Sequence, residues 1–329
     1  MTISNTEKLR RFYDQFSHDD HVLIVINADP DSIASAMAVK RLLWRKVSNA
    51  TISNINIIKR PDNIAMIRLL GVNLVPVKDI VKDCFSRFVM VDSQPDHSEV
   101  FTRFPIDIII DHHPDTEVKA PFVDIRPKYG ATASIMTEYL RAAKIKPSTK
   151  LAAGLFYAIK TDTNNFVRQT LIEDIRAFQF LYRHANLNIV NKIERSELRL
   201  DFLKYFKVAL ENKRIRKGRL FAHFGRVVNP DVCVVLADFF IKISSVDWSI
   251  VSGVYDHNLI VVFRNDGFRK DAGKIAKKSF GELGSAGGHK SVARAEIPLE
   301  ALKDEVDYEN NKKLLIWIIN RVEKRAGKK

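Results

Sequence analysis

The chain has 329 residues, 46% of them hydrophobic, and a formal net charge of +14 at pH 7. This length is sufficient for two packed domains, and the positive charge favours anionic ligands such as phosphates, nucleotides or nucleic acid. Every apolar run is shorter than the ~20 residues that a membrane-spanning helix needs, so we expect no membrane segment.

The first 20 residues are polar and charged and lack the apolar core of a signal peptide. Cys84 and Cys233 are the two cysteines, and they lie far apart without a metal-binding spacing. So few cysteines do not indicate a disulfide scaffold. We therefore expect reduced thiols in a cytoplasmic protein.

In the first half of the chain, short β-branched runs alternate with helical patterns, which is typical of βαβ units and a parallel sheet. The expected strands are Val22–Asn27, Ile55–Ile58, Phe88–Val91 and Ile106–Ile110. The expected helices are Ser32–Lys46, one capped by Asp62 and ended by Gly71, Thr132–Arg141, and Leu151–Ile159. This α/β pattern defines a first domain of residues 1–185.

The pattern changes after this domain. Residues 171–211 read as helical and highly charged, and we expect a helical connector at residues 186–217. A smaller mixed α/β domain, residues 218–329, then begins with new strands. Its expected elements are the strands Leu220–Val228, Ile250–Tyr255 and Leu259–Phe263, a Gly-rich stretch at Gly281–Gly288, and a closing helix Asn310–Lys324.

Acidic residues follow the expected strands of the first domain or end a helix beside them. They are Asp29 and Asp31, Asp92, Asp111 with His112 and His113, and Asp162. An isolated aspartate at a strand end is commonly a helix cap or turn former. However, ligands collect at the carboxyl ends of the strands in open parallel sheets, and several acidic clusters converge there. Carboxylates with imidazole suit Mn, Fe or Zn better than Mg, and two such ions ~3.5–4 Å apart can promote phosphoryl transfer.

The motifs Asp29-Pro30-Asp31, Val91-Asp92-Ser93, Asp111-His112-His113 and Thr161-Asp162-Thr163 occur in an order that resembles the DHH phosphoesterase superfamily. Near the C-terminus, Gly287-Gly288-His289 with Arg264 upstream resembles the companion DHHA1 substrate-binding domain. The resemblance therefore implies a parallel-sheet DHH domain followed by a DHHA1 domain.

The resemblance also implies a role for each matching residue. The implied metal ligands are Asp92 as the bridge, Asp31, His112 and Asp162 at one site, and Asp29 at the other. The implied catalytic residues are Asp111, which orients a histidine, and His113, which contacts the phosphate or protonates the leaving group. The implied substrate-binding residues are Arg264, Gly287, Gly288 and His289. The implied cofactor is one or two Mn²⁺ ions, with Mg²⁺ as the other candidate.

One position departs from the family pattern. A metal-binding histidine is usual four residues before Asp29, where this chain has Val25. Valine cannot ligate a metal, so the site of Asp29 lacks one expected ligand. That site could bind metal weakly, take a ligand from the substrate, or leave the centre mononuclear.

The leading hypothesis is a metal-dependent hydrolase that cleaves short oligonucleotides, linear dinucleotides or 3′-phosphoadenosine 5′-phosphate (pAp) by metal-activated water in an interdomain cleft. Its expected partner is a short nucleic acid or nucleotide, with a homodimer left open. A processive exonuclease and an inorganic pyrophosphatase are both disfavoured. The alternative is a regulatory nucleotide-binding protein whose catalysis is impaired because of Val25.

Two smaller predictions concern local features. The small and hydroxyl residues at 129–134 precede a helix, where they could bind an anion or serve as a plain N-cap. His97 has no partner at ligand spacing and is expected to be an ordinary surface or core histidine.

Overall fold

The computed structural model describes residues 3–168, 170–196, 200–266 and 270–326. The chain divides into two compact units, Met1–Glu197 (unit 1) and Leu198–Lys329 (unit 2). The division differs from the expected 1–185, 186–217 and 218–329. The helix Leu187–Glu194 packs on helices of unit 1, and the helix Leu203–Asn212 packs on a strand of unit 2. The expected connector is therefore shared between the units, and its residues 197–199 lie outside the described residues.

Unit 1 is built on a six-stranded parallel sheet with the order β3-β2-β1-β4-β5-β6. Its strands are β1 His21–Ile26, β2 Asn49–Asn54, β3 Leu74–Pro76, β4 Arg87–Val91, β5 Ile108–Asp111 and β6 Phe122–Ile125. Its helices are α1 Asn5–Tyr13, α2 Pro30–Leu42, α3 Pro61–Leu70, α4 Thr132–Ala142, α5 Thr149–Asp162, α6 Ile172–Tyr182 and α7 Leu187–Glu194. The predicted parallel-sheet α/β class is confirmed.

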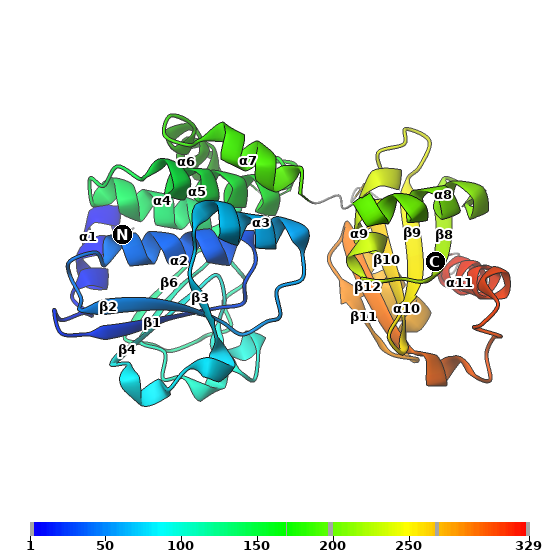
Figure 1. Cartoon of the computed structure of the whole chain (residues 1–329), viewed down its shortest axis with the longest axis horizontal. Helices are drawn as coiled ribbons and strands as arrows, with labels where there is room; N and C mark the ends of the chain where they lie inside the picture. Colours follow the sequence, from blue (N-terminus) through cyan, green and yellow to red (C-terminus); the bar gives the residue numbers. More distant parts are fainter. Residues whose placement is uncertain (1–2, 169, 197–199, 267–269, 327–329) are drawn as a thin grey trace. The chain divides into compact units, whose positions relative to one another are not determined.

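The two faces of this sheet bury different apolar clusters, because successive strand residues point to opposite faces. Val22, Ile24 and Ile26 of β1 join the large cluster under the helices. Leu23 and Val25 join a smaller cluster on the other face. Figure 1 shows the longer helices gathered on the first face, with loops and short turns on the second.

Three local predictions for unit 1 were wrong. The segment Ile55–Ile58 is not a strand, because the second strand is the preceding β2. Helix α3 begins at Pro61 with Arg60 as its N-cap, so Asp62 is its second residue and not its cap. Helix α2 ends at Leu42, four residues before the predicted end. The predicted end of α3 is confirmed, since Gly71 has the left-handed backbone (φ 73°) that glycine tolerates best.

Unit 2 contains a second six-stranded sheet with the order β11-β12-β10-β9-β8-β7. Its strands are β7 Arg214–Arg216, β8 Arg219–Arg226, β9 Trp248–Tyr255, β10 Asn258–Asn265, β11 Ser285–Gly288 and β12 Val292–Pro298. Its helices are α8 Leu203–Asn212, α9 Asp231–Phe240, α10 Ala272–Phe280 and α11 Asn311–Ala326. Neighbouring strands are antiparallel except β8 and β9, which are parallel. Apolar residues of α8 and α9 pack on one face of the sheet, and those of α10 and α11 pack on the other.

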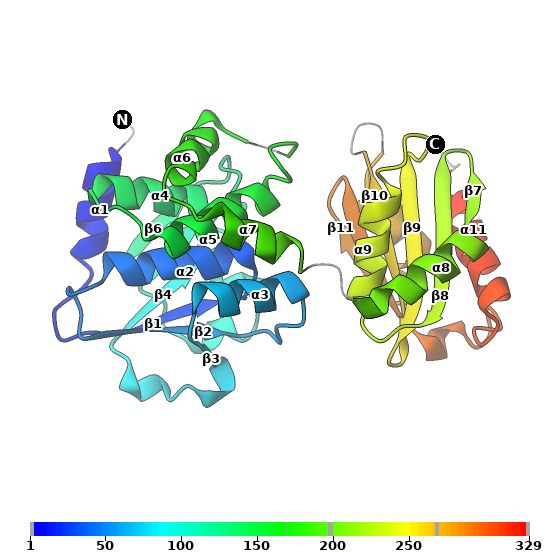
Figure 2. The same ribbon diagram turned by 45° about the horizontal axis from the view of Figure 1, so that its top comes forward.

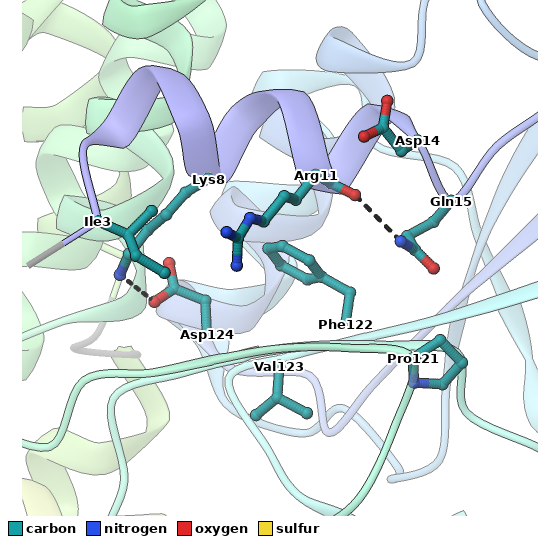
Figure 3. A pocket seen from close by; sticks show the side chains of 9 residues that line it. All are labelled: Ile3, Lys8, Arg11, Asp14, Gln15, Pro121, Phe122, Val123 and Asp124. Carbon is teal, nitrogen blue, oxygen red and sulfur yellow. Dashed lines mark hydrogen bonds and ion pairs between the residues drawn. The ribbon is translucent and has the colours of Figure 1, made fainter.

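A pocket of about 400 Å³ lies in unit 1 between α1 and β6 (Figure 3). Lys8 reaches across it to Asp124, with Nζ and Oδ1 2.6 Å apart. Asp124 also accepts hydrogen bonds from Arg126 and Tyr139, so its charge is already compensated. The lining contains none of the predicted site residues.

Candidate metal centre

Carboxylates and imidazoles meet at the carboxyl edge of the parallel sheet in unit 1. Asp29 is the N-cap of α2 after β1, Asp92 follows β4, Asp111 ends β5, and Asp162 ends α5. Parallel strands bring their carboxyl ends to one edge. Residues far apart in the sequence therefore become neighbours.

Four predicted metal ligands lie together at this edge. Asp31, Asp92, His112 and Asp162 each offer a ligand atom, and these atoms all lie within 4.8 Å of one another. The Nε2 atom of His112 is 3.3 Å from Asp162, 3.5 Å from Asp92 and 3.9 Å from Asp31. We call these four residues the metal cluster.

The ring of His112 is oriented for ligation. Its Nδ1 lies 3.2 Å from the backbone oxygen of Tyr129, which assigns the Nδ1–H tautomer to a neutral ring. Nε2 then presents its lone pair to the carboxylates. Within the described part of the chain this buried atom has no hydrogen-bond partner. Because this lone pair faces carboxylates, it is satisfied either by a proton, as in the metal-free protein, or by a cation held by the metal cluster.

The start of α4 holds two cluster carboxylates. The backbone amides of Thr132 and Ala133 donate to Asp31 over 2.6 and 2.7 Å. The Thr132 hydroxyl donates to Oδ1 of Asp92 over 2.9 Å. One prediction for residues 129–134 was that they bind an anion. The anion that they bind is the protein's own Asp31 carboxylate. The sequence placed Thr132 in a helix start that could bind an anion, but its hydrogen bond to Asp92, 40 residues earlier in the chain, was not predicted.

The carboxylates of the cluster repel one another in the absence of a cation. Burial first, and then the charge of Asp162, raises the pKa of Asp31 to about 8. Burial and the charges of Asp31 and Asp29 raise the pKa of Asp92 well above its usual value. For His112, burial is outweighed by Asp162 and Asp31, which raise its pKa to about 9. A bound divalent cation would remove this conflict by neutralising the carboxylates.

Beside the metal cluster, Asp111 fixes the ring of His113. Oδ1 of Asp111 lies 2.8 Å from Nδ1 of His113, and it also accepts the backbone amides of His112 and His113. Although burial opposes it, the hydrogen bond from His113 lowers the pKa of Asp111. Asp111 is thus an ionised carboxylate that leaves Nε2 of His113 available for a substrate.

Two further residues, Gln94 and His97, belong to this region. The buried Gln94 amide donates to Asp111 over 2.7 Å and to the backbone oxygen of Pro114. Its oxygen accepts both the amide and the hydroxyl of Thr116. The rings of His97 and His113 lie 5.4 Å apart, and His97, Asp111 and His113 form a group that could hold a metal ion. His97 is exposed, as expected for a surface histidine, and the short turn after β4 brings its ring beside that of His113.

Asp29 has a different environment from the metal cluster. Its Oδ1 accepts the amide of Ser32 over 2.9 Å as the cap of α2. Among the described residues, the groupings able to hold a metal ion do not include Asp29. Val25 is fully buried in the apolar cluster of the second sheet face. The ligand expected from that position is therefore absent.

In unit 2, the predicted substrate-binding residues lie near the adjoining strands β10, β11 and β12. Nε of Arg264 is 2.6 Å from Oδ1 of Asp238, so this guanidinium is oriented by an acidic neighbour. Gly288 has φ 145°, and a Cβ there would lie 2.4 Å from the oxygen of Val292. A Cβ on Gly287 would meet nothing within 4 Å, and His289 is exposed. The structure thus explains Gly288 by its backbone and leaves Gly287 beside open space.

Comparisons with known proteins find a family match within unit 1. Residues 21–159 match the model of the DHH family, N-terminal domain. An uncharacterized protein of Methanocaldococcus jannaschii is 37% identical over 295 residues, which is 89% of this chain. The chain spans 61% of the length of that relative.

Solved structures show a related fold. An exopolyphosphatase-related protein from Bacteroides fragilis has a TM-score of 0.73 at 15% identity, and 96% of each chain is covered. A pGpG-specific phosphodiesterase from Vibrio cholerae has a TM-score of 0.42 at 11% identity, covering 92% of this chain and 99% of that one. Among the described residues, none of the helices has the length and apolar character that crossing a membrane requires.

Proposed function

Residues 21–159 match the DHH family, N-terminal domain, and from this premise we propose that the chain is a metal-dependent phosphoesterase. The observation that carries the proposal is the convergence of Asp31, Asp92, His112 and Asp162, whose ligand atoms all lie within 4.8 Å of one another. Carboxylates brought together in this way repel one another unless a cation lies between them. The grouping therefore fits a cation site.

The metal cluster would hold the cation. Three carboxylates and one imidazole suit Mn²⁺ better than Mg²⁺, so Mn²⁺ is the cation we propose. When bound, such an ion supplies Lewis acidity toward a phosphoryl oxygen and a water nucleophile at neutral pH. Tyr129 holds the ring of His112 in the ligating tautomer, and Thr132 and Ala133 hold the carboxylates.

His113, oriented by Asp111, would hold the proton that the leaving oxygen needs. Asp111 binds Nδ1 of His113, as in other pairs where a carboxylate orients an imidazole. Nε2 can then contact the phosphate or hold a proton for the leaving oxygen. Asp111 keeps its charge during this step because its pKa is lowered by His113.

The proposed substrates are short oligonucleotides, linear dinucleotides or pAp. The excess of positive charge over the whole chain, +14, supports an anionic substrate. In unit 2, which we propose to be a DHHA1 domain, Arg264, Gly287, Gly288 and His289 would bind the end of the substrate remote from the cleaved bond. Arg264 can offer its planar fork to a phosphate.

A regulatory nucleotide-binding protein is the second candidate, and Val25 is the observation that favours it. This side chain is fully buried among apolar residues and offers no ligand atom. A centre with a single weakly held ion could bind a nucleotide without turning it over.

The test is hydrolysis of 5′-phosphorylated pApA, pGpG and pAp with Mn²⁺, with Mg²⁺ and with EDTA, alongside metal analysis of the purified protein. The variant is Asp92→Asn, and the matched control is Asp19→Asn at an exposed position. We expect Mn²⁺-dependent turnover by the parent and the control and none by Asp92→Asn. Nucleotide binding without turnover would favour the regulatory candidate, and turnover retained in Asp92→Asn would refute the proposed centre.

A further inference from the structure

The positive charge of the chain is concentrated in unit 2. Residues 198–329 contain 26 lysines and arginines and 16 aspartates and glutamates, a net charge of +10 out of +14. The metal cluster lies in unit 1, so most of the charge excess is outside the unit that holds the predicted metal ligands. Metal binding in unit 1 therefore does not account for the positive charge of unit 2.

Many of the cationic residues of unit 2 cluster in one β-hairpin. The segment 213–219 reads Lys-Arg-Ile-Arg-Lys-Gly-Arg, with five cationic residues in seven. It forms the edge strand β7, a two-residue turn and the start of β8. All three residues of β7 are exposed. Figure 2 shows this strand at one border of the unit 2 sheet, beside α11.

Helix α11 adds to the same surface. NH1 of Arg216 lies 3.4 Å from Oε2 of Glu323, which brings the hairpin against the C-terminal part of α11. The exposed Lys324 is the next residue of that helix. The acidic residues nearby include Glu323 itself, Asp247, whose carboxylate lies close to Gly218, and the exposed Glu211, two positions before Lys213. We define the basic hairpin surface as Lys213, Arg214, Arg216, Lys217, Arg219 and Lys324.

Two features of the hairpin act against its own stability. Arg216 lies directly opposite Arg219 in the antiparallel pair, and like charges in such positions repel. The turn residues Lys217 and Gly218 have φ of 49° and 74°. Such a turn favours asparagine or aspartate in the first position, whereas lysine is disfavoured there. Residue types that are unfavourable at their own positions in a fold tend to mark functional positions.

Protection of an edge strand against aggregation explains part of this charge, because natural edge strands often carry lysine or other charges. It requires neither an opposed arginine pair nor a lysine in the turn. A polyanion accounts for both, since bound phosphates would neutralise the opposed guanidinium groups and pair with the exposed ammonium group of Lys217. Guanidinium groups bind phosphate through two parallel hydrogen bonds.

We propose that the basic hairpin surface binds the phosphate backbone of a single-stranded nucleic acid. The choice of nucleic acid over an anionic lipid surface rests on the proposed function, since a nuclease-like substrate has the same backbone chemistry. Binding at this surface would be independent of sequence, because phosphates carry no base information. The surface would hold strands longer than the short substrates proposed for the metal centre of unit 1.

The experiment measures binding of a labelled 20-nucleotide oligo(U) by the full chain carrying Asp92→Asn, so that no hydrolysis interferes. The hairpin variant adds Arg214→Glu and Lys217→Glu. The matched control adds Lys242→Glu and Lys312→Glu, which change the net charge equally in unit 2; position 312 is roughly 18 Å along α11 from Lys324 at 1.5 Å per residue. We expect the hairpin variant to bind at least tenfold more weakly than the control. The slope of log K against log salt should also fall by about 1.4, for two lost contacts at ~0.7 each.

Each other outcome would overturn the proposal. An equal loss in both variants would show a general charge effect. Unchanged oligo(U) binding with new light scattering from the hairpin variant would assign the surface to edge protection. Binding to phosphatidylserine vesicles without binding to oligo(U) would assign it to lipid. Thermal unfolding must show that both variants are folded. Changing Arg214, Lys217 and Arg219 together to glutamine should also weaken oligo(U) binding, without reversing any charge.

The result can be separated from that of the proposed function. In the parent chain, which keeps Asp92, the hairpin changes should leave the turnover of a dinucleotide unchanged. A dinucleotide is too short to need a second phosphate-binding surface. If the parent turns over no substrate while the hairpin variant loses oligo(U) binding, the phosphoesterase proposal fails and the binding surface stands.

Discussion

The backbone amide of Ala133 donates a 2.7 Å hydrogen bond to Oδ1 of Asp31, a residue 102 positions earlier in the chain. Together with the amide of Thr132, it occupies the first turn of α4, where the helix dipole favours a negative charge. This helix terminus therefore stabilises a proposed metal ligand and is closed to a substrate phosphate. Oδ1 also accepts the Ser35 hydroxyl over 3.3 Å, so Oδ2, which accepts the amide of Thr132, is the oxygen that keeps a lone pair able to face a cation.

The first prediction concerns the stability of the metal-free protein as a function of pH. The pKa of Asp31 is raised to about 8, so its contribution to stability is complete below pH ~4 and is lost as the pH rises through about 8. The pKa of His112 is raised to about 9, so its contribution is lost as the pH rises from ~6.5 through about 9. We expect the melting temperature in EDTA to fall between pH 5 and 9, and Asp31→Asn to reduce this fall.

Thermal unfolding by circular dichroism at pH 5, 7 and 9 measures this effect. Mn²⁺ should restore stability most at pH 9, because ligation keeps the carboxylates ionised without repulsion. Asp19→Asn, at an exposed position, is the matched control. A fall equally steep in Asp31→Asn and in the control would contradict the assignment.

The second prediction separates the charge of Asp92 from its backbone. Asp92 has φ 59°, a left-handed conformation that asparagine tolerates and alanine does not favour. We expect Asp92→Asn to be more stable than the parent in EDTA at pH 8, because it removes a buried repelled carboxylate. Asp92→Ala should be about 1 kcal/mol less stable than Asp92→Asn, because of the backbone strain and the lost Thr132 hydrogen bond. Urea unfolding measures both differences, and equal stability of the two variants would exclude a backbone effect.

The third prediction assigns Gln94 as a positioning residue. Its amide holds Asp111, which in turn holds His113. Gln94→Glu keeps the shape but replaces a donor by a carboxylate facing Asp111. Partners of this kind typically contribute 10–100-fold to activity. We therefore expect turnover to fall about 10–100-fold and the pH profile of kcat/KM to shift, with metal affinity nearly unchanged.

Gln15→Glu is the matched substitution for this test, since Gln15 lies outside the metal centre and donates to the backbone of Arg11. Its pH profile should equal that of the parent. A loss of bound metal in Gln94→Glu comparable to the loss of turnover would instead indicate a general collapse of the centre.

The sequence predicted the parallel sheet of unit 1 well, because buried strands in such sheets are continuous apolar runs. The predicted ranges of β1, β4 and β5 overlap the observed strands, with ends that differ by at most two residues. The second strand was misplaced because Asn49–Asn54 has the polar sequence NATISN, whereas the apolar Ile55–Ile58 follows it. β6 and β7 were missed because edge strands of three or four residues give almost no alternation to detect.

The residues of the metal cluster carry a sequence pattern, whereas their supports do not. Gln94, Thr132 and Tyr129 act through a backbone or side chain brought close by the fold, at separations of 17, 40 and 17 residues from the groups they hold. Their residue types are common in turns and at helix starts. Only the tertiary structure therefore distinguishes them from ordinary loop residues.

The fourth prediction tests whether the opposed arginines of the hairpin destabilise the fold. Arg216→Thr removes the like-charge pair with Arg219 and places a residue of high β propensity on the strand. The exposed ion pair with Glu323 that is lost with it is worth little.

We expect the variant to be about 0.2–1 kcal/mol more stable than the matched Arg214→Thr, whose cross-strand partner is the uncharged Phe221. Urea unfolding at low salt measures the difference, which should shrink at high salt because the repulsion is screened. If Arg216→Thr is instead the less stable of the two, the arginine pair strengthens the fold, and its conflict with stability no longer argues for a polyanion partner.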